Sequence, residues 1–183
     1  MPPPLVSSAT TRLPATPSQH RYEREGNKSV WLASERVAAL EPSDLLRQIT
    51  RYKKLLLKTQ PVDAENGTNK SIIVVLTDVS AGEAKTILSD VLQQLAVPSY
   101  VDDGLVLGGF YGTNDGRALY NPEFRPFTAP IPFLLIRPAV IDDWKFSLED
   151  EDWMRRWSHR FREAAVLSLA NELRHLPWRE RHG

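Results

Sequence analysis

The sequence predicts a single α/β (α+β) domain in which a mixed sheet of about four strands packs against three helices. Residues 71–77 form an uninterrupted β-branched, apolar run that is typical of a central strand covered on both faces. The segments on either side of this run repeat their apolar residues at helical spacing. Strands and helices therefore alternate along the chain, and its 183 residues, 42% of them hydrophobic, suffice for one compact core.

The N-terminal residues are expected to form a flexible arm over residues 1–27, ahead of a globular domain over residues 28–183. The first 20 residues are rich in Pro, Ser, Thr and Ala, and they contain no acidic group and no continuous apolar segment. Residues 28–33 then combine Val and Trp between turn-forming and charged neighbours, which predicts the first strand.

The remaining elements follow from capping chemistry and periodicity. Ser80 stands where a helix N-cap is needed, and Trp153 and Trp157 begin an apolar stripe near the C-terminus. The elements are, in chain order, a helix from Pro42 to about Thr59, the strand over residues 71–77, a helix over residues 81–96, strands over residues 104–111 and 132–136, and one long helix over residues 150–176.

Composition narrows the partners and the location. Lys and Arg together number 23, as do Asp and Glu, so no net field attracts nucleic acid or a membrane surface. No apolar run reaches the roughly 20 residues that cross a bilayer. Cysteine is absent, which excludes disulfides, thiolate metal sites and cysteine nucleophiles. We therefore expect a cytoplasmic protein whose partner is a small-molecule metabolite, and a homodimer is compatible with the sequence.

The connection over residues 112–131 is longer than ordinary loops, and loops of this length are usually either disordered or functional. Its prolines restrict the backbone and favour order, and Phe124 and Phe127 are expected to anchor it to the core. A stiff backbone that carries polar side chains is how binding sites are preorganised. The polar side chains that we consider for such a site are Tyr120, Asn121, Glu123, Arg125 and Thr128.

Arg125 and Arg137 stand at the two ends of this stiff segment. Each guanidinium presents planar, forked donors that suit a carboxylate or a phosphate, so the two arginines are a candidate clamp for an anionic ligand. The alternative is structural, because ion pairs of the fold perturb such groups as well. In that alternative Arg125 pairs with Glu123 or Asp115, and Arg137 pairs with Asp142.

Metal chemistry has little support in the sequence. Asp142 and Asp143 directly follow the last predicted strand, but a metal site needs a third ligand, so Asp143 is expected to end the strand or to contact a cation. No histidine has a second ligand at metal spacing, and we expect no metal. Core packing explains Trp153 and Trp157 better than an aromatic ligand pocket does.

Residues 120–137, with the sequence YNPEFRPFTAPIPFLLIR, resemble the Asn-Pro-Asp-Phe-Arg-Pro, Pro-x-Pro and Ile-Arg pattern of a bacterial family catalogued as domain of unknown function 6875. The likeness is clearest over residues 105–146 and looser over residues 71–95. Members of this family often occur among natural-product biosynthesis genes. The resemblance therefore implies a tailoring role on a small metabolite.

Three departures from the family pattern concern cofactors. Many relatives look to have a Cys-Pro-Phe segment, a Phe-His-Pro and an Ile-Arg-His. This chain has no cysteine and reads Phe110-Tyr111-Gly112 and Ile136-Arg137-Pro138 at the other two places. The missing groups would be the natural ligands of a haem, as in the guanidine-hydroxylating haem proteins that the family resembles faintly. We therefore expect no cofactor.

The leading expectation is a cofactor-independent tailoring enzyme that holds a polar or anionic intermediate during a cyclisation, isomerisation or condensation. Its substrate-binding residues would be Arg125, Arg137, Asn121 and Trp144, and its proton-transfer residues Tyr111, Tyr120, Glu123 and Asp142. Two alternatives remain open. One is a haem-dependent oxygenase whose axial ligand is His159 or His175. The other is a non-catalytic accessory protein that meets a carrier protein through a basic helix face formed by Arg47, Arg51 and Lys54.

Overall fold

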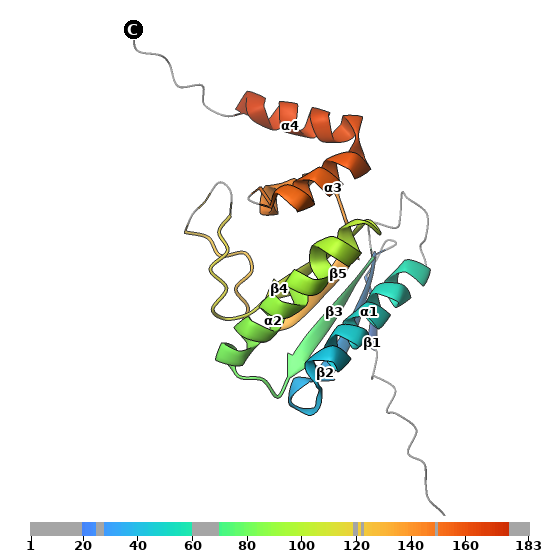
Figure 1. Ribbon diagram of the computed structural model, residues 1–183, viewed down its shortest axis with the longest axis vertical. Coiled ribbons are helices and arrows are strands. Elements are labelled where there is room, and N and C mark those ends of the chain that lie inside the picture. The colour runs from blue at the N-terminus through green and yellow to red at the C-terminus, as the bar shows by residue number, and fades with distance from the viewer. Residues whose placement is uncertain are drawn as a thin grey trace, which may run out of the picture.

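Five strands form one mixed sheet (Figure 1). The structure is a computed structural model, and it describes residues 20–24, 28–59, 70–118, 121, 123–148 and 150–175. The strands are β1 (His20–Arg24), β2 (Lys28–Arg36), β3 (Lys70–Thr77), β4 (Leu105–Phe110) and β5 (Phe133–Pro138). Their order across the sheet is β1-β2-β3-β5-β4, so β3 is central and β1 and β4 are the edge strands.

This sheet confirms the predicted fold class and contains one strand more than expected. β3 is parallel to β2 and antiparallel to β5, so that Val74 lies between Ala33 and Leu134. The four strands that the sequence predicts are β2 to β5. The additional strand β1 pairs antiparallel with β2 and falls within residues 1–27, which the sequence assigns to an arm. The rest of that arm lies outside the described residues.

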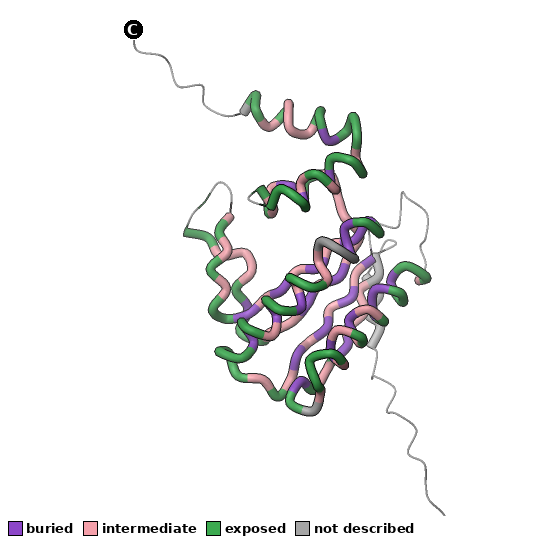
Figure 2. The backbone as a smooth tube through the Cα atoms, in the orientation of Figure 1, coloured by how far each residue is buried: buried purple, intermediate pink, exposed green. Residues whose placement is uncertain are grey.

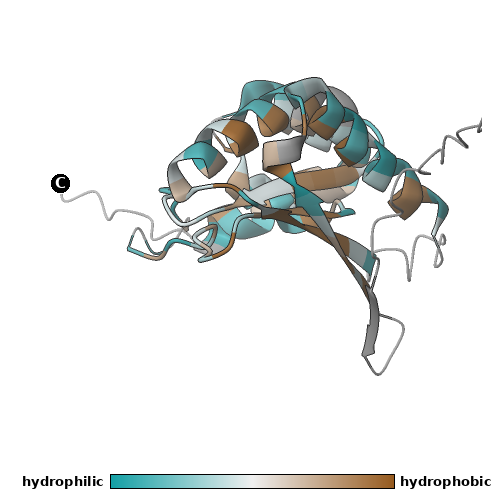
Figure 3. Ribbon diagram, turned by 90° about the horizontal axis from the view of Figure 1, so that it is seen from below, coloured by the Kyte–Doolittle hydropathy of each residue, from teal (hydrophilic) through white to brown (hydrophobic). Residues whose placement is uncertain are grey.

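Helices α1 (Pro42–Lys58) and α2 (Ala81–Leu95) cover one face of the sheet (Figures 1 and 3). Pro42 occupies the first turn of α1, where the missing N–H has no intrahelical role. α2 begins at a capping box, because Ser80 Oγ accepts the Glu83 N–H at 3.3 Å and Glu83 Oε2 accepts the Ser80 N–H at 2.9 Å. The start of α2 agrees with the sequence prediction, whereas the N-cap of α1 is Glu41, which makes no side-chain cap hydrogen bond.

The main core lies between these two helices and the sheet. In β3 the residues Ile72, Val74 and Leu76 are buried, and the residues between them are half buried. Figure 2 shows the same concentration of buried residues along the sheet and the inner sides of α1 and α2. The prediction that this strand is covered on both faces is therefore correct for one face only. The run is apolar throughout, so the pattern of its residues does not distinguish the two faces.

The long helix predicted over residues 150–176 is wrong. The structure has two helices, α3 (Glu151–Phe161) and α4 (Glu163–His175), which are separated at Arg162, where φ is 48°. They lie beyond the ends of β4 and β5 (Figure 1).

Among the described residues, no helix combines the length and apolar character needed to cross a membrane.

A second core cluster fixes α3 to the rest of the domain. Trp144, Trp153 and Trp157 are buried together with Val101 and Ala165. The rings of Trp153 and Trp157 are stacked with their centroids 6.4 Å apart. Core packing of these tryptophans is therefore confirmed.

One turn links α1 to α3. It follows the π-helix η3 (Ala96–Val101) and contains Asp102 and Asp103. Asp103 Oδ2 lies 2.6 Å from Lys53 Nζ in α1, and Asp102 pairs with Arg156 in α3. The neighbouring carboxylates of Asp102 and Asp103 thus form ion pairs with two different helices, α3 and α1.

Candidate functional site

A groove of about 490 Å³ follows the edge strand β4. β4 and β5 form its floor. Its rims are formed by residues 126 and 127 of the long loop, by the short helix η4 (Ile141–Phe146) and by the start of α3. The lining residues that matter most here are Val106, Gly108, Phe110, Leu135, Arg137 and Phe146. Its volume falls within the roughly 300–1,000 Å³ that is usual for ligand pockets.

Aromatic rings form a continuous wall beside this groove. The ring of Phe110 stacks on Phe133 with centroids 4.5 Å apart and meets Phe127 at 5.6 Å. Phe127 in turn contacts Phe146 edge to face at 5.6 Å. Such ring contacts stabilise one another beyond the area that they bury. The wall therefore offers a flat apolar ligand a preformed surface.

Arg137 and Asp143 provide the polar end of the groove. Arg137 lies in β5 and Asp143 in η4, and Arg137 donates from Nη1 to Asp143 Oδ2 at 2.9 Å and from Nη2 to Oδ1. Asp143 also accepts the Val140 N–H at 2.7 Å, and its side chain is only 3% exposed, against 26% for Arg137. The forked pairing fixes the guanidinium plane.

Part of the Arg137 guanidinium remains available to a ligand. Besides the Asp143 bonds, Nη1 donates to the Pro138 carbonyl oxygen at 3.0 Å. The Nε–H and the second Nη2 hydrogen have no hydrogen-bond partner among the described residues. An oriented group with unused donors is what a polar anchor requires.

The sequence predicts Asp142 as the ion-pair partner of Arg137. This prediction is wrong, because Arg137 pairs with Asp143. The turn of η4 directs Asp142 to the surface, where its Oδ1 lies 3.7 Å from Lys145 Nζ. The prediction that Asp143 contacts a cation is confirmed. Asp142 is not among the groove-lining residues, and a proton-transfer role for it stays a prediction.

The loop residues that the sequence analysis selected, Asn121, Glu123 and Arg125, do not line the groove. Asn121 and Glu123 are exposed, and Asn121 Oδ1 accepts the Glu123 N–H at 3.1 Å. Arg125 Nη1 lies 3.5 Å from the Phe124 carbonyl oxygen, and Arg125 does not line the groove with Arg137. Phe124 is 57% exposed, so its expected anchoring role is wrong, whereas Phe127 packs in the ring wall as predicted.

Tyr111 and Trp144 are packing residues in the structure. Tyr111 belongs to the main core, and its backbone pairs with the loop, donating to Phe127 at 3.2 Å and accepting from Ala129 at 3.3 Å. Trp144 is buried and donates from Nε1 to Ser168 Oγ at 3.0 Å. The roles expected for both in catalysis and binding stay predictions. Tyr120 lies outside the described residues.

Two polar residues of the groove, Asn114 and Asp150, were not predicted from the sequence. Asn114 donates from Nδ2 to the Gly109 carbonyl oxygen at 3.1 Å and so covers part of the β4 edge. Asp150 is the N-cap of α3, and its Oδ1 accepts the Trp153 N–H at 2.9 Å. Its Oδ2 has no hydrogen-bond partner among the described residues. The predicted helix start at residue 150 is a signal for Asp150, but nothing in the sequence indicates that Asp150 and Arg137 line the same groove.

The part of the chain that the structure describes contains no cluster of metal ligands, and the haem alternative stays a prediction. No three His, Asp or Glu side chains gather there as metal ligands. His159 is exposed in a second cavity that is lined mainly by arginines. His175 ends α4.

The fold and the groove define a single-domain α+β protein with a ligand-sized groove along one edge of an open mixed sheet. A family model described as Domain of unknown function (DUF6875) matches residues 22–172, so the chain belongs to this family. Neither the curated proteins nor the solved structures contain a match to the chain.

Proposed function

We propose that this protein binds a small, partly aromatic metabolite in the groove along β4 and takes part in small-molecule biosynthesis without a cofactor. The observation that carries the proposal is Arg137, which Asp143 holds in one orientation in a mainly apolar groove and which has unused hydrogen-bond donors. An apolar cleft with a few oriented polar groups is the usual form of a ligand site.

The charge of this polar end selects the kind of ligand group. Arg137 is already neutralised by Asp143, and Asp150 adds a second carboxylate to the lining, so the groove presents the Arg137 hydrogen-bond donors but no net positive charge. A full anion would gain less there than at an unpaired arginine, because the nearby carboxylate repels it. A ligand with a carbonyl-type acceptor next to a flat apolar body fits the groove best. Of the polar or anionic intermediates expected from the sequence, the groove therefore favours the polar, uncharged ones.

Asp150 supports a second candidate, a cofactor-independent tailoring enzyme that moves a proton. Asp150 lines the groove, and one of its oxygens is occupied by the Trp153 N–H while the other has no partner among the described residues. A carboxylate oxygen within reach of a bound ligand is a general-base candidate. Proton abstraction beside a carbonyl would be assisted by the Arg137 donors, because they stabilise the negative charge that develops on the carbonyl oxygen.

The binding proposal is tested with a library of small aromatic ketones, esters and carboxylic acids, screened by saturation-transfer NMR. Phe146 and Phe124 give a matched pair of variants, because each is 57% exposed but only Phe146 lines the groove. Phe146→Ala is expected to weaken the best ligands about tenfold or more, since an aromatic contact contributes roughly 1–3 kcal/mol. Phe124→Ala is expected to bind as the wild type does. Equal affinities in both variants would remove the groove as the binding site.

The proton-transfer candidate is tested on the same ligands in D2O. Wild-type protein is expected to speed the exchange of a carbon-bound ligand proton for deuterium, followed by proton NMR. Asp150→Asn keeps the N-cap of α3, because Asn and Asp are comparable caps, and it is expected to bind the ligand while losing the exchange. Binding without exchange in the wild type would leave an accessory binding protein. A Soret band of the purified protein would instead favour the haem alternative.

A further inference from the structure

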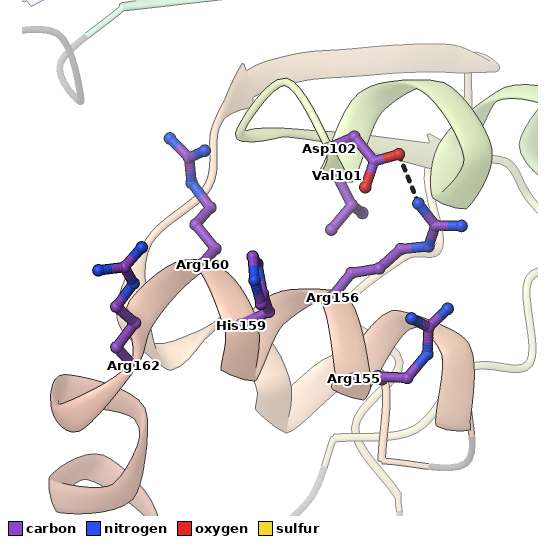
Figure 4. A pocket seen from close by; sticks show the side chains of 7 residues that line it. All are labelled: Val101, Asp102, Arg155, Arg156, His159, Arg160 and Arg162. Carbon is purple, nitrogen blue, oxygen red and sulfur yellow. Dashed lines mark hydrogen bonds and ion pairs between the residues drawn. The ribbon is translucent and has the colours of Figure 1, made fainter.

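A second cavity of about 550 Å³ lies between α3 and the turn that follows η3. Four arginines and one histidine line it, together with Val101 and Asp102 (Figure 4). Figure 4 shows His159 between Arg156 and Arg160 along α3, with Arg162 at the turn that ends the helix. The cavity is separate from the groove along β4, and Val101 is the residue that borders both.

The arginines around this cavity outnumber the carboxylates that pair with them. Arg155 pairs with Asp152, and Arg156 pairs with both Asp152 and Asp102. Hydrogen bonds from Arg155 and then Arg156 lower the pKa of Asp152. Both carboxylates are thus already paired with Arg155 or Arg156. The two remaining arginines, Arg160 and Arg162, have no ion pair with any described residue. Two positive charges are thus in excess here, in a chain whose formal net charge is zero.

The Arg160 guanidinium packs against the backbone at Gly104. Gly104 has φ +72°, and a Cβ added there would collide with the Arg160 guanidinium. The absence of a side chain at Gly104 therefore lets the guanidinium lie close to the backbone of the turn. A planar guanidinium held in this way loses less entropy when it binds a ligand than a free surface arginine does.

Arg162 occupies a backbone conformation that favours glycine. Its φ of 48° and ψ of −121° end α3, and its N–H donates to the Ser158 carbonyl oxygen at 2.8 Å. A left-handed conformation at a residue with a long side chain costs stability, and such residues cluster at functional sites. A glycine would terminate the helix with less strain. The presence of arginine therefore indicates that the side chain of Arg162 has a functional role.

We propose that Arg156, His159, Arg160 and Arg162 bind the phosphate group of a small phosphorylated molecule. Guanidinium forks match the oxygens of a phosphate, and two unpaired arginines match its two negative charges. A nucleic-acid chain fits less well, because the basic residues form one cavity and the chain as a whole has no net positive charge. This proposal does not depend on the groove along β4.

The proposal is tested by isothermal titration calorimetry with inorganic pyrophosphate as the probe. Arg160→Ala and Arg162→Gly are each expected to weaken binding at least tenfold. Arg162→Gly is also expected to raise the melting temperature, so its loss of binding would not reflect unfolding. Arg174→Ala is the matched control, because Arg174 is an exposed arginine of α4 that bonds only to Asn171 among the described residues, and it should bind pyrophosphate normally.

Three results would overturn the proposal. The first is the absence of saturable pyrophosphate binding to the wild type. The second is an equal loss in Arg174→Ala, which would mean a general charge effect. The third is a short single-stranded DNA that binds more tightly than pyrophosphate and loses affinity in the same variants. Phe146→Ala should leave pyrophosphate binding intact, so failure of the groove proposal and failure of this one are distinguishable.

Discussion

Arg137 and Asp143 show how far a residue-level prediction reaches in this chain. An arginine at the end of an apolar strand and two following aspartates indicate an ion pair, and such a pair exists. Which aspartate takes part depends on the turn of η4, and this turn brings Asp143 back to the strand while Asp142 stays exposed. Neighbouring residues in a short helix point in different directions, so sequence alone could not choose between them.

The Arg137–Asp143 pair is expected to behave as a coupled unit. Asp143→Asn should lower the free energy of unfolding by about 1–3 kcal/mol, because a buried hydrogen-bonded charge is lost and Arg137 keeps its charge. The double variant Arg137→Gln with Asp143→Asn should lose less than the sum of the two single variants. Urea unfolding of the four proteins measures this coupling, and additive losses would contradict it.

At the scale of elements, the short helices and the loop were the least predictable parts. The strands β2 to β5 and the start of α2 follow from apolar periodicity and capping residues. The break at Arg162 has no such signal, because neither glycine nor proline marks it and the apolar pattern continues across it. The long loop was expected to direct Arg125 to a site with Arg137, but its course depends on tertiary contacts such as the Phe127 ring packing.

The break between α3 and α4 carries a stability prediction. Arg162→Gly should raise the free energy of unfolding by about 1 kcal/mol, because glycine adopts a positive φ without the steric cost that a Cβ brings. Thermal and urea unfolding measure the change. Arg162→Ala serves as the control, since it removes the guanidinium and keeps the Cβ, and it should show no comparable gain. A gain of the same size in both variants would contradict the strain argument.

The capping box of α2 predicts a pH dependence. Hydrogen bonds from Ser80 lower the pKa of Glu83. A carboxylate with a lowered pKa in the folded state stabilises the fold above the pKa of the unfolded chain, and this contribution disappears as the pH falls through the lowered value. Glu83→Gln keeps a capping-box side chain without the charge. Its stability deficit should be present at about pH 7 and absent at about pH 3; a deficit independent of pH would refute the prediction.

The molecule as a whole has two hydrophobic clusters, and their arrangement explains which large-scale features were predictable. The main cluster lies between sheet and helices, as layered packing predicts from the order of elements. The second contains Trp144, Trp153 and Trp157, and the sequence indicated a core role for the last two. The position of α3 at the end of the sheet depends on its contacts with Val101, Asp102 and η4, which no periodicity encodes.

The second cluster is expected to unfold first when it is weakened. Trp157→Ala should cost about 3–5 kcal/mol, because Trp157 is 1% exposed and its removal leaves a cavity. With Trp31 and Trp178 replaced by Phe, Trp144 and Trp153 remain as the fluorescence reporters of that cluster, while far-ultraviolet circular dichroism reports the whole fold. The fluorescence midpoint in urea should therefore fall below the dichroism midpoint in this variant. Coincident midpoints would mean that the two clusters unfold as one unit.

The groove along β4 is tested most directly by mapping a bound ligand onto the 15N-labelled protein. With the best ligand from the screen, the amide resonances of Val106, Gly108, Leu135, Arg137 and Asp143 are expected to shift together and to saturate with one affinity. A third cavity, of about 320 Å³, lies between the starts of α1 and α2 and is lined by Leu40, Leu45 and Ile87. Shifts confined to that cavity, with the groove resonances unchanged, would contradict the assignment of the groove as the ligand site.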